Sequence, residues 1–355
     1  MKNVFVHGIG AVSPAGWGVE ALRMALDEKS VIALKPVIRP GWKNPLQVRQ
    51  VPAPPARPSF LAHARLRRSS PITQFGVAAG LEALGENLHA VGGGQCRLGI
   101  VQCVMSGCIN YSRRFYEETL RDPSTASPLV FPETVFNAPA SHLAALLGTR
   151  AINYTLIGDP GTFLQGMALA ANWLLNDRVD GCLVIGAEET DWLTADAFRR
   201  FQRKMILSNG AGAIFLRTEP GPIRLSRITD AHPFLQNQSR RCAALKMRAE
   251  LDGDSAATLL CDSTQGVPRL DSAEVEAWKD WTGIRTSPKT ILGEGLMAAA
   301  AWQCVFAIDA LREKRCAEAN VSVVGCNQQA IGAQFVAEDQ SEKPEEVRDE
   351  PLQIK

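Results

Sequence analysis

The sequence contains two kinds of side chain that often act together in acyl chemistry, cysteines and histidines. A cysteine thiolate can take up an acyl group, and a nearby histidine can move the protons of such a reaction. The nine cysteines have no regular spacing, and the closest two, Cys103 and Cys108, do not form a CxxC pair. This pattern indicates neither a zinc site nor a disulfide framework, so most cysteines are expected in the core. The five histidines all precede residue 237, so the remainder of the chain offers no imidazole: His7, His63, His89, His142 and His232.

Several carboxylates could act as a general acid or a general base in catalysis. The candidates are Asp159, Asp262 and Glu294, with Lys289 close enough in sequence to Glu294 to adjust a carboxylate pKa. Asp159 also has a structural role to play, because Asp-Pro before an apolar run is typical of a helix start, with the aspartate as N-cap and Pro160 as first helical residue.

Two further side chains are conceivable nucleophiles. Cys261 and Ser263 flank Asp262, but Cys261 ends a predicted buried strand, where its thiol would be inert. The glycines of the opening VHGIGAV do not form a dinucleotide fingerprint, because a third glycine and the downstream acid are missing. No metal ligands and no cofactor motif are recognised.

These side chains must be positioned by elements that alternate between strand and helix. The opening residues predict a buried strand, a turn bearing Gly8 and Gly10, and a helix. Further strands are expected at residues 98–104, 151–157, 181–186, 212–216, 223–228, 257–261 and 321–324. Helices are expected at residues 72–84, 132–147, 163–175, 238–250, 272–281 and 294–312, the last apolar almost all round and therefore central. Two successive runs of this kind predict an α/β fold with largely parallel sheets.

Composition is consistent with a large globular core. The chain has 355 residues, of which 46% are hydrophobic and 21% charged, and its net charge is +1. That balance predicts no general attraction to nucleic acid or to a membrane. No secretory signal and no long apolar span is present, so a cytoplasmic protein is expected.

One stretch has a strong charge bias. Residues 31–71 are rich in proline and arginine and predict an irregular surface excursion. From residue 29 to residue 81 there is no acid, whereas nine residues are basic.

Four segments, in the same order along the chain, resemble β-ketoacyl-acyl-carrier-protein synthases. They are VHGIGAVSPAGWGVEAL, FPETVFNAPASHLAALLG, GDPGTFLQGMALAANWLLNDRVDGCLVIGAEE and SPKTILGEGLMAAAAWQCVFAIDAL. The resemblance implies the thiolase fold, with two similar βαβ-rich halves in a layered α-β-α-β-α core, normally assembled as a dimer. The two halves are expected at residues 1–218 and 219–337. After residue 337 the composition turns polar and charged, so an acidic tail of residues 338–355 is expected to be disordered.

The catalytic positions that the resemblance implies are changed. Pro160 stands where the family has its cysteine, so both the thiol and a backbone N–H are missing. The loop of the first histidine corresponds to residues 261–266 and places Asp262 there, and the second histidine corresponds to Glu294, preceded by a retained Lys289. The glycine-rich loop that supplies an oxyanion amide reads Gly-Cys-Asn-Gln-Gln at residues 325–329. The resemblance therefore implies a scaffold without condensing activity of its own.

Three functions remain open on this basis. The first is a partner subunit, similar to chain-length factors, that pairs with an active ketosynthase to shape the acyl tunnel in polyketide, aryl-polyene or fatty-acid-type biosynthesis. The second is a thiolase-fold acyltransferase or hydrolase with a rewired site. The third is a non-catalytic homodimer that binds an acyl chain or an acyl carrier protein. Carrier proteins dock through acidic helices, so Arg65, Arg67 and Arg68 are candidate docking residues, although a solvated arginine-rich loop explains them equally well.

Overall fold

The protein is built from two halves that share one strand order. The computed structural model describes residues 2–235, 237–251, 257–326 and 328–338. In the first half the strands lie in the order β6-β5-β7-β8-β1, and in the second half in the order β12-β11-β13-β14-β9. In each half the three strands at the outer end are parallel and the other two join them antiparallel. By position in the chain, both halves therefore have the order third, second, fourth, fifth, first.

The strands of the two halves meet where β1 lies beside β9. Phe5 of β1 faces Arg224 of β9, and the amide of Leu225 donates to the carbonyl of Val4 at 2.9 Å. The first half contains β1 (Phe5–Ser13), β5 (Leu98–Val104), β6 (Ile152–Ile157), β7 (Gly181–Glu188) and β8 (Gly210–Arg217). The second half contains β9 (Ile223–Ile228), β11 (Thr258–Cys261), β12 (Ile284–Thr286), β13 (Glu318–Val324) and β14 (Gln329–Ala337). Short pieces β2 (Gly16–Trp17) and β10 (His232–Pro233) pair with β1 and β14.

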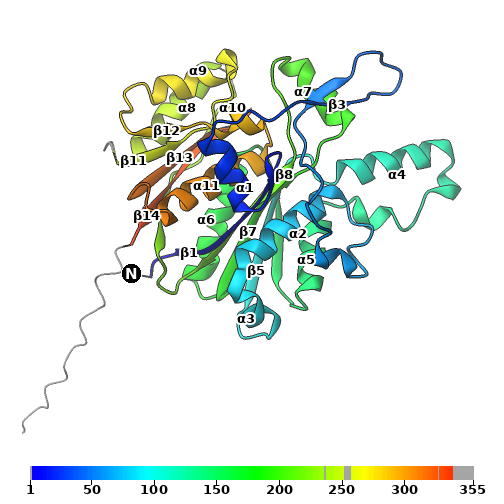
Figure 1. Cartoon of the computed structure of the whole chain (residues 1–355), viewed down its shortest axis with the longest axis horizontal. Coiled ribbons are helices and arrows are strands. Elements are labelled where there is room, and N and C mark those ends of the chain that lie inside the picture. The colour runs from blue at the N-terminus through cyan, green and yellow to red at the C-terminus, as the bar shows by residue number, and fades with distance from the viewer. Residues whose placement is uncertain (1, 236, 252–256, 327, 339–355) are drawn as a thin grey trace, which may run out of the picture.

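Helices form three layers around these strands, as Figure 1 shows. Helices α6 (Thr162–Leu175) and α11 (Met297–Arg312) lie in the centre, where α11 contacts strands of both halves. Helices α2 (Pro71–Leu84) and α5 (Ala138–Leu146) cover the outer face of the first half, and α8 (Asn237–Glu250) and α9 (Pro268–Ala277) that of the second. The architecture is the layered α-β-α-β-α core that the sequence predicted.

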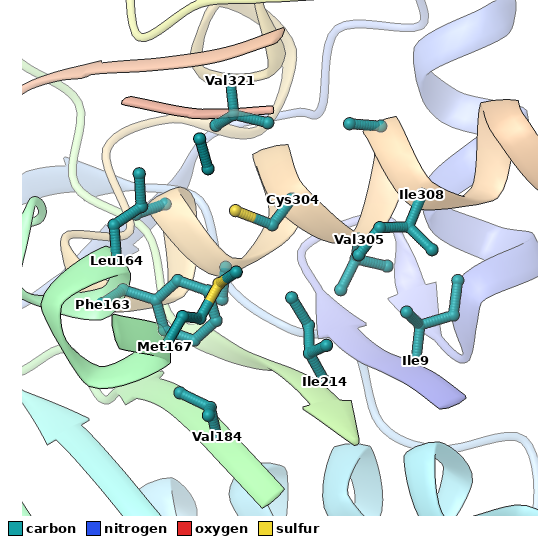
Figure 2. Close-up of a cluster of buried hydrophobic side chains, with 14 of the residues drawn as sticks. Ile9, Phe163, Leu164, Met167, Val184, Ile214, Cys304, Val305, Ile308 and Val321 are labelled. Carbon is teal, nitrogen blue, oxygen red and sulfur yellow. The ribbon is translucent and has the colours of Figure 1, made fainter. Parts of the chain in front are cut away.

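The central helices are held by apolar packing on every side. Every residue of α11 from Met297 to Leu311 is buried, so the prediction of a central helix is confirmed. Burial of this kind is the main stabilising contribution to the fold. Figure 2 shows the contact between α6 and α11 and the strands around it, with these side chains: Phe163, Leu164, Met167, Cys304, Val305, Ile308, Ile9, Val184, Ile214 and Val321.

The remaining elements belong to the first half and its surface, apart from α10, which belongs to the second half. They are α1 (Val19–Asp27), β3 (Lys35–Val37), β4 (Leu46–Val48), η1 (Ser59–Ala62), η2 (Gly85–Asn87), α3 (Leu88–Gly92), α4 (Ile109–Arg121), η3 (Pro123–Thr125), η4 (Phe131–Glu133), α7 (Trp192–Phe201) and α10 (Pro288–Leu292). The excursion at residues 31–71 is irregular as predicted, apart from the β3–β4 hairpin and the short η1. Helices α4 and α7 and strand β14 were not predicted.

Two predicted helices are wrong in their extent. Residues 272–281 were expected to form a helix, whereas α9 covers Pro268–Ala277. Residues 132–147 were expected to form one helix, but α5 begins only at Ala138. Pro139 lies in its first turn, the one place where a helix tolerates the missing N–H of proline. The residues before it form η4 and a turn instead.

The glycines at the start of the chain do not form a turn. Gly8 and Gly10 lie within β1, directly beneath α2. A Cβ atom on Gly8 would lie 1.7 Å from the carbonyl oxygen of Ala83, and one on Gly10 would lie 2.0 Å from that of Ala79. These positions therefore require glycine because helix and strand backbones touch there.

Candidate functional site

The position expected to hold a nucleophile lies in the turn between β6 and α6. Pro160 is buried and offers no reactive group. The prediction that Asp159 is the N-cap and Pro160 the first helical residue is wrong, because α6 begins at Thr162 with Gly161 as its N-cap. Asp159 stabilises the preceding turn instead: its carboxylate accepts from the Gly161 amide at 3.2 Å, and its carbonyl accepts from Thr162 at 2.8 Å.

The Asp159 carboxylate also ties this turn to the loop between β13 and β14. It accepts hydrogen bonds from the amides of Gln328 at 3.1 Å and Gln329 at 3.3 Å, and from the Gln329 side chain at 3.2 Å. A Cβ atom on Gly325 would lie 1.8 Å from its Oδ2 atom. Burial raises the pKa of Asp159, and these hydrogen bonds offset only part of that effect. The loop expected to supply an oxyanion amide thus donates its hydrogen bonds to the protein's own carboxylate. Residue 327 of that loop lies outside the described residues.

Lys289 and Glu294 form a buried ion pair. The Lys289 Nζ atom lies 2.7 Å from Glu294 Oε2, and the other carboxylate oxygen accepts from the Leu296 amide at 2.8 Å, at the start of α11. Burial is the largest single influence and would lower the pKa of Lys289, but the charge and hydrogen bond of Glu294, together with the charges of Cys326 and Glu274, raise the pKa overall. Both oxygens of Glu294 are therefore engaged in holding α10 and α11 in place.

Asp262 is also fully engaged. Arg285 Nε lies 2.5 Å from its Oδ2 atom, and Thr264 donates to its Oδ1 atom from the amide at 2.9 Å and from the hydroxyl at 2.7 Å. The carboxylate is buried, so it anchors the loop after β11 to β12.

Neither candidate nucleophile beside Asp262 is available. Cys261 is buried in β11, and burial raises the pKa of its thiol well above the usual value. The Ser263 hydroxyl donates to Glu274 at 2.6 Å and accepts from the Val324 amide at 3.0 Å. Burial, followed by the charge of Asp262, raises the pKa of Glu274 to about 7.

Two residues that the sequence did not single out complete the site. Arg240 is buried on α8, and its guanidinium donates to the carbonyl of Cys326 at 3.2 Å. Cys326 is half-buried; burial and then the Glu294 charge raise the pKa of its thiol. The charges of Lys289, Asp159 and Arg240 also act on that thiol, so these groups converge at one place. Nothing local in the sequence indicates this role for Arg240, because α8 is distant from the loop along the chain.

A cavity of about 660 Å³ opens beside this cluster, between the end of β6 and the loop before β14. The face of α6 that lines it begins with Thr162 and continues with Gln165 and Leu169. The Gln329 side chain donates to Gln165 at 3.2 Å and to Thr162 at 3.4 Å across the floor of the cavity.

The candidate docking residues lie apart from these contacts. Arg65, Arg67 and Arg68 are exposed in the turn between η1 and α2. The Tyr111 hydroxyl donates to the Arg68 carbonyl at 2.5 Å and so attaches this turn to α4. The position of the arginines leaves the docking hypothesis open.

The described residues contain neither a metal-binding cluster nor a membrane-spanning helix. Among the described residues, no three histidine, cysteine or acidic side chains lie close enough to hold a metal ion together. The helices in that part are also too short or too polar to cross a membrane.

Comparison with known proteins places this geometry in a fold family. Searches for a matching family model and for a related curated protein found no match. A β-ketoacyl synthase from Burkholderia phymatum superimposes with a TM-score of 0.78 over 96% of this chain and 100% of its own, at 15% identity. The chain has the fold of the ketosynthases. At this level of identity, the likeness to the thiolase superfamily concerns the fold.

Two ketosynthase-fold structures with chain length factors are similarly close. The ishigamide ketosynthase/chain length factor matches with a TM-score of 0.75 over 94% of this chain and 99% of its own, at 19% identity. A ketosynthase in complex with its chain length factor from Xenorhabdus doucetiae matches with a TM-score of 0.77 over 95% and 98%, at 15% identity. The recognised resemblance to ketosynthases and chain length factors is thus supported at the level of structure.

Proposed function

We propose that this chain is a non-condensing ketosynthase-like subunit that pairs with an active ketosynthase and helps to enclose the growing acyl chain in polyketide or fatty-acid-type biosynthesis. The observation that carries the proposal is the Asp159 carboxylate, which takes the hydrogen bonds of Gln328 and Gln329. A tetrahedral intermediate would need such donors free, together with a nucleophile. Pro160 supplies neither a nucleophile nor a backbone N–H donor.

The proposed loss of condensing activity is also supported by the ion pairs and hydrogen bonds of the carboxylates Glu294 and Asp262. Glu294 and Asp262 each hold a cation and a backbone amide, so neither is poised to exchange a proton with a substrate. A rewired acyltransferase or hydrolase would need at least one of these groups free, and none is. We therefore favour the partner subunit over a rewired enzyme.

Pairing is supported by exposed apolar side chains on α4, on the segment around η4 and on β6 of the first half. Helix α4 projects from the body of the molecule in Figure 1, and none of its residues is buried. Strand β6 lies at the end of the strand order, with one edge unpaired among the described strands. Nine large apolar side chains, each between 38 and 68% exposed, form what we call the pairing surface: Tyr116, Leu120, Leu129, Phe131, Val135, Phe136, Ile152, Tyr154 and Ile157.

An exposed surface of this kind requires a partner. An amphipathic helix without a buried face and an open apolar strand edge are both unfavourable in water. A strand edge satisfies its amides by pairing with another strand, and a two-fold interface can do so with a chain of the same fold. Several of the similar structures are named as ketosynthases with their chain length factors, which supports a ketosynthase as the partner.

The first test is co-expression with a cysteine-bearing ketosynthase encoded beside this chain, followed by native mass measurement. We expect a one-to-one complex. A stable monomer that ignores such a ketosynthase would refute the pairing, and a homodimer in its presence would favour the acyl-binding or carrier-binding homodimer.

The second test addresses chemistry. The chain is incubated with acyl and malonyl thioesters of coenzyme A and of carrier protein, and its intact mass and the release of carbon dioxide are followed. No covalent acyl adduct and no decarboxylation above background are expected. Turnover by the isolated chain would refute the non-condensing role without affecting the pairing result.

Carrier-protein docking at the exposed arginines is part of the same proposal. One similar structure is named as an acyl-carrier protein in complex with its ketosynthase, and an acidic partner suits an arginine cluster. Changing Arg67→Glu and Arg68→Glu should weaken binding of an acidic carrier protein about tenfold or more. Lys246→Glu, an exposed change on α8, is the control. Binding unaffected by the arginine changes would dismiss this docking site.

A further inference from the structure

A second hollow lies at the opposite end of the first-half strands from the site described above. It has a volume of about 460 Å³ and is found where the chain enters β5, β6 and β7, near α3 at the bottom of Figure 1. Each of these three strand starts contributes an arginine to its wall: Arg97 before β5, Arg150 before β6 and Arg178 before β7. The three side chains are far apart in sequence and meet only because the strands are parallel neighbours.

The charge in the hollow is unbalanced. Arg97 is held by Asp180, with NH2 lying 2.6 Å from Oδ1. Within the described part of the chain, neither Arg150 nor Arg178 forms an ion pair with a carboxylate. Arg178 is instead positioned by Trp173, with its guanidinium carbon 5.6 Å from the ring centre. No acidic residue lines the hollow.

The rest of the wall suits a ligand with a charged and an apolar part. Thr149 adds a hydroxyl beside Arg150. Gly94 and Gly148 have φ angles of 72° and 64°, and open space lies where their side chains would be, so the two turns leave room for a ligand near the backbone. Val91, Leu98, Ile152 and Val179 supply apolar surface.

From these features we infer that the hollow binds a small molecule bearing a phosphate or pyrophosphate group. Guanidinium groups bind phosphate oxygens through paired charge-assisted hydrogen bonds, which favours arginine at such sites. The volume lies in the range of small-ligand pockets. This site is separate from the Asp159 cluster and borders the pairing surface, with which it shares Ile152.

The experiment is calorimetric titration of the full-length chain, in the oligomeric state in which it purifies, with sodium pyrophosphate and with ADP. Both should bind, and the affinity should fall as salt is raised because the contacts are exposed charges. The variant Arg150→Gln/Arg178→Gln should bind both probes at least roughly tenfold more weakly.

The matched control is Arg57→Gln/Lys246→Gln, which removes the same charge at two exposed positions away from the hollow. It should bind the probes as the unchanged chain does. Equal weakening in both variants would mean general charge attraction and would overturn the site. Absence of binding by the unchanged chain at millimolar pyrophosphate and ADP would overturn it as well. Circular dichroism of both variants shows whether each retains its fold, and the Arg150→Lys/Arg178→Lys variant, which keeps the charge, should recover part of the affinity.

Discussion

At the scale of single residues, carboxylates hold the structure at the positions where the resemblance predicts catalytic groups. Glu294 pairs with Lys289, Asp262 pairs with Arg285, and Asp159 accepts from the amides of Gly161, Gln328 and Gln329. A buried carboxylate is costly unless its oxygens are satisfied, so each of these sites depends on its partners. The three carboxylates therefore hold together separate segments of the chain.

The buried ion pair allows a direct test of this view. Lys289→Met should destabilise the chain by about 3–5 kcal/mol, because the Glu294 charge is left buried without its cation. Lys289→Met/Glu294→Met should be less destabilised than the single variant, since an apolar pair can replace a buried ion pair at little cost. Urea unfolding measures both. If the double variant is as unstable as the single variant, the instability of Lys289→Met does not come from the unpaired charge of Glu294.

The Glu274 carboxylate should make stability depend on pH. It keeps its proton in the folded chain up to about pH 7, whereas the reference value is 4.5. Between these values the folded state binds more protons than the unfolded state, so the free energy of unfolding falls as pH rises, by about 3 kcal/mol for this group.

Glu274→Gln, which cannot ionise, should flatten that slope when unfolding is measured from pH 4.5 to 7.5. Burial also raises the pKa values of Glu188 and Glu189, to about 8 and about 7, and both contribute a slope of the same sign. The test therefore compares the pH dependence of the free energy of unfolding of Glu274→Gln with that of the unchanged chain. Identical slopes would contradict the role of Glu274.

At the scale of elements, the first half depends on close contacts and shared caps. Glu189 follows β7 and accepts from the amides of Asn110 at 2.7 Å and Ile72 at 3.1 Å, so one carboxylate serves the first turns of both α4 and α2. Unpaired amides at helix starts are stabilised by such acceptors.

The contact between β1 and α2 should tolerate no side chain at Gly8. Gly8→Ala would place a Cβ atom 1.7 Å from the Ala83 carbonyl oxygen, and separating two backbones should cost about 3 kcal/mol or more. Gly76→Ala, in α2 itself, is the matched control. Its Cβ atom would lie 3.6 Å from Ile185, an ordinary contact, so stability should be unchanged or rise by about 0.5–1 kcal/mol. Thermal unfolding distinguishes the two, and a stable Gly8→Ala protein would contradict the close approach.

At the scale of the whole molecule, the repeated strand order explains why two sites can exist at opposite ends of one half. The carboxyl ends of the parallel strands meet the second half and form the Asp159 cluster, while their amino ends remain at the surface and carry the arginine hollow. The pairing surface lies outside the packed layers, which leaves α4 with no buried residue.

Changing the pairing surface should affect assembly and leave the chain itself intact. Tyr116→Ser/Leu120→Ser alters two exposed residues, so the free energy of unfolding of the chain alone should change by less than about 0.5 kcal/mol. Affinity for the ketosynthase partner should fall about tenfold or more in an equilibrium binding measurement. Leu245→Ser/Val275→Ser, exposed apolar positions of the second half, is the control. Equal affinity of both variants would contradict the assignment of this surface.

The sequence by itself determined the α/β class, the two halves and most strands and buried helices, because these depend on apolar periodicity that each segment carries locally. It also indicated that Pro160 cannot act as a nucleophile, since that follows from residue type. Helix α4 escaped prediction because its apolar side chains face away from the protein's own core.

Tertiary structure alone decided what the remaining polar groups do. The contact of Asp159 with Gln329 joins residues 170 positions apart, and Arg240 reaches Cys326 from another layer. The turn glycines proved to be strand residues for the same reason, because only the approach of α2 shows why Gly8 lacks a side chain. Hydrogen bonds and steric contacts between distant segments leave no periodic trace in the sequence, so they become visible only when the chain is folded.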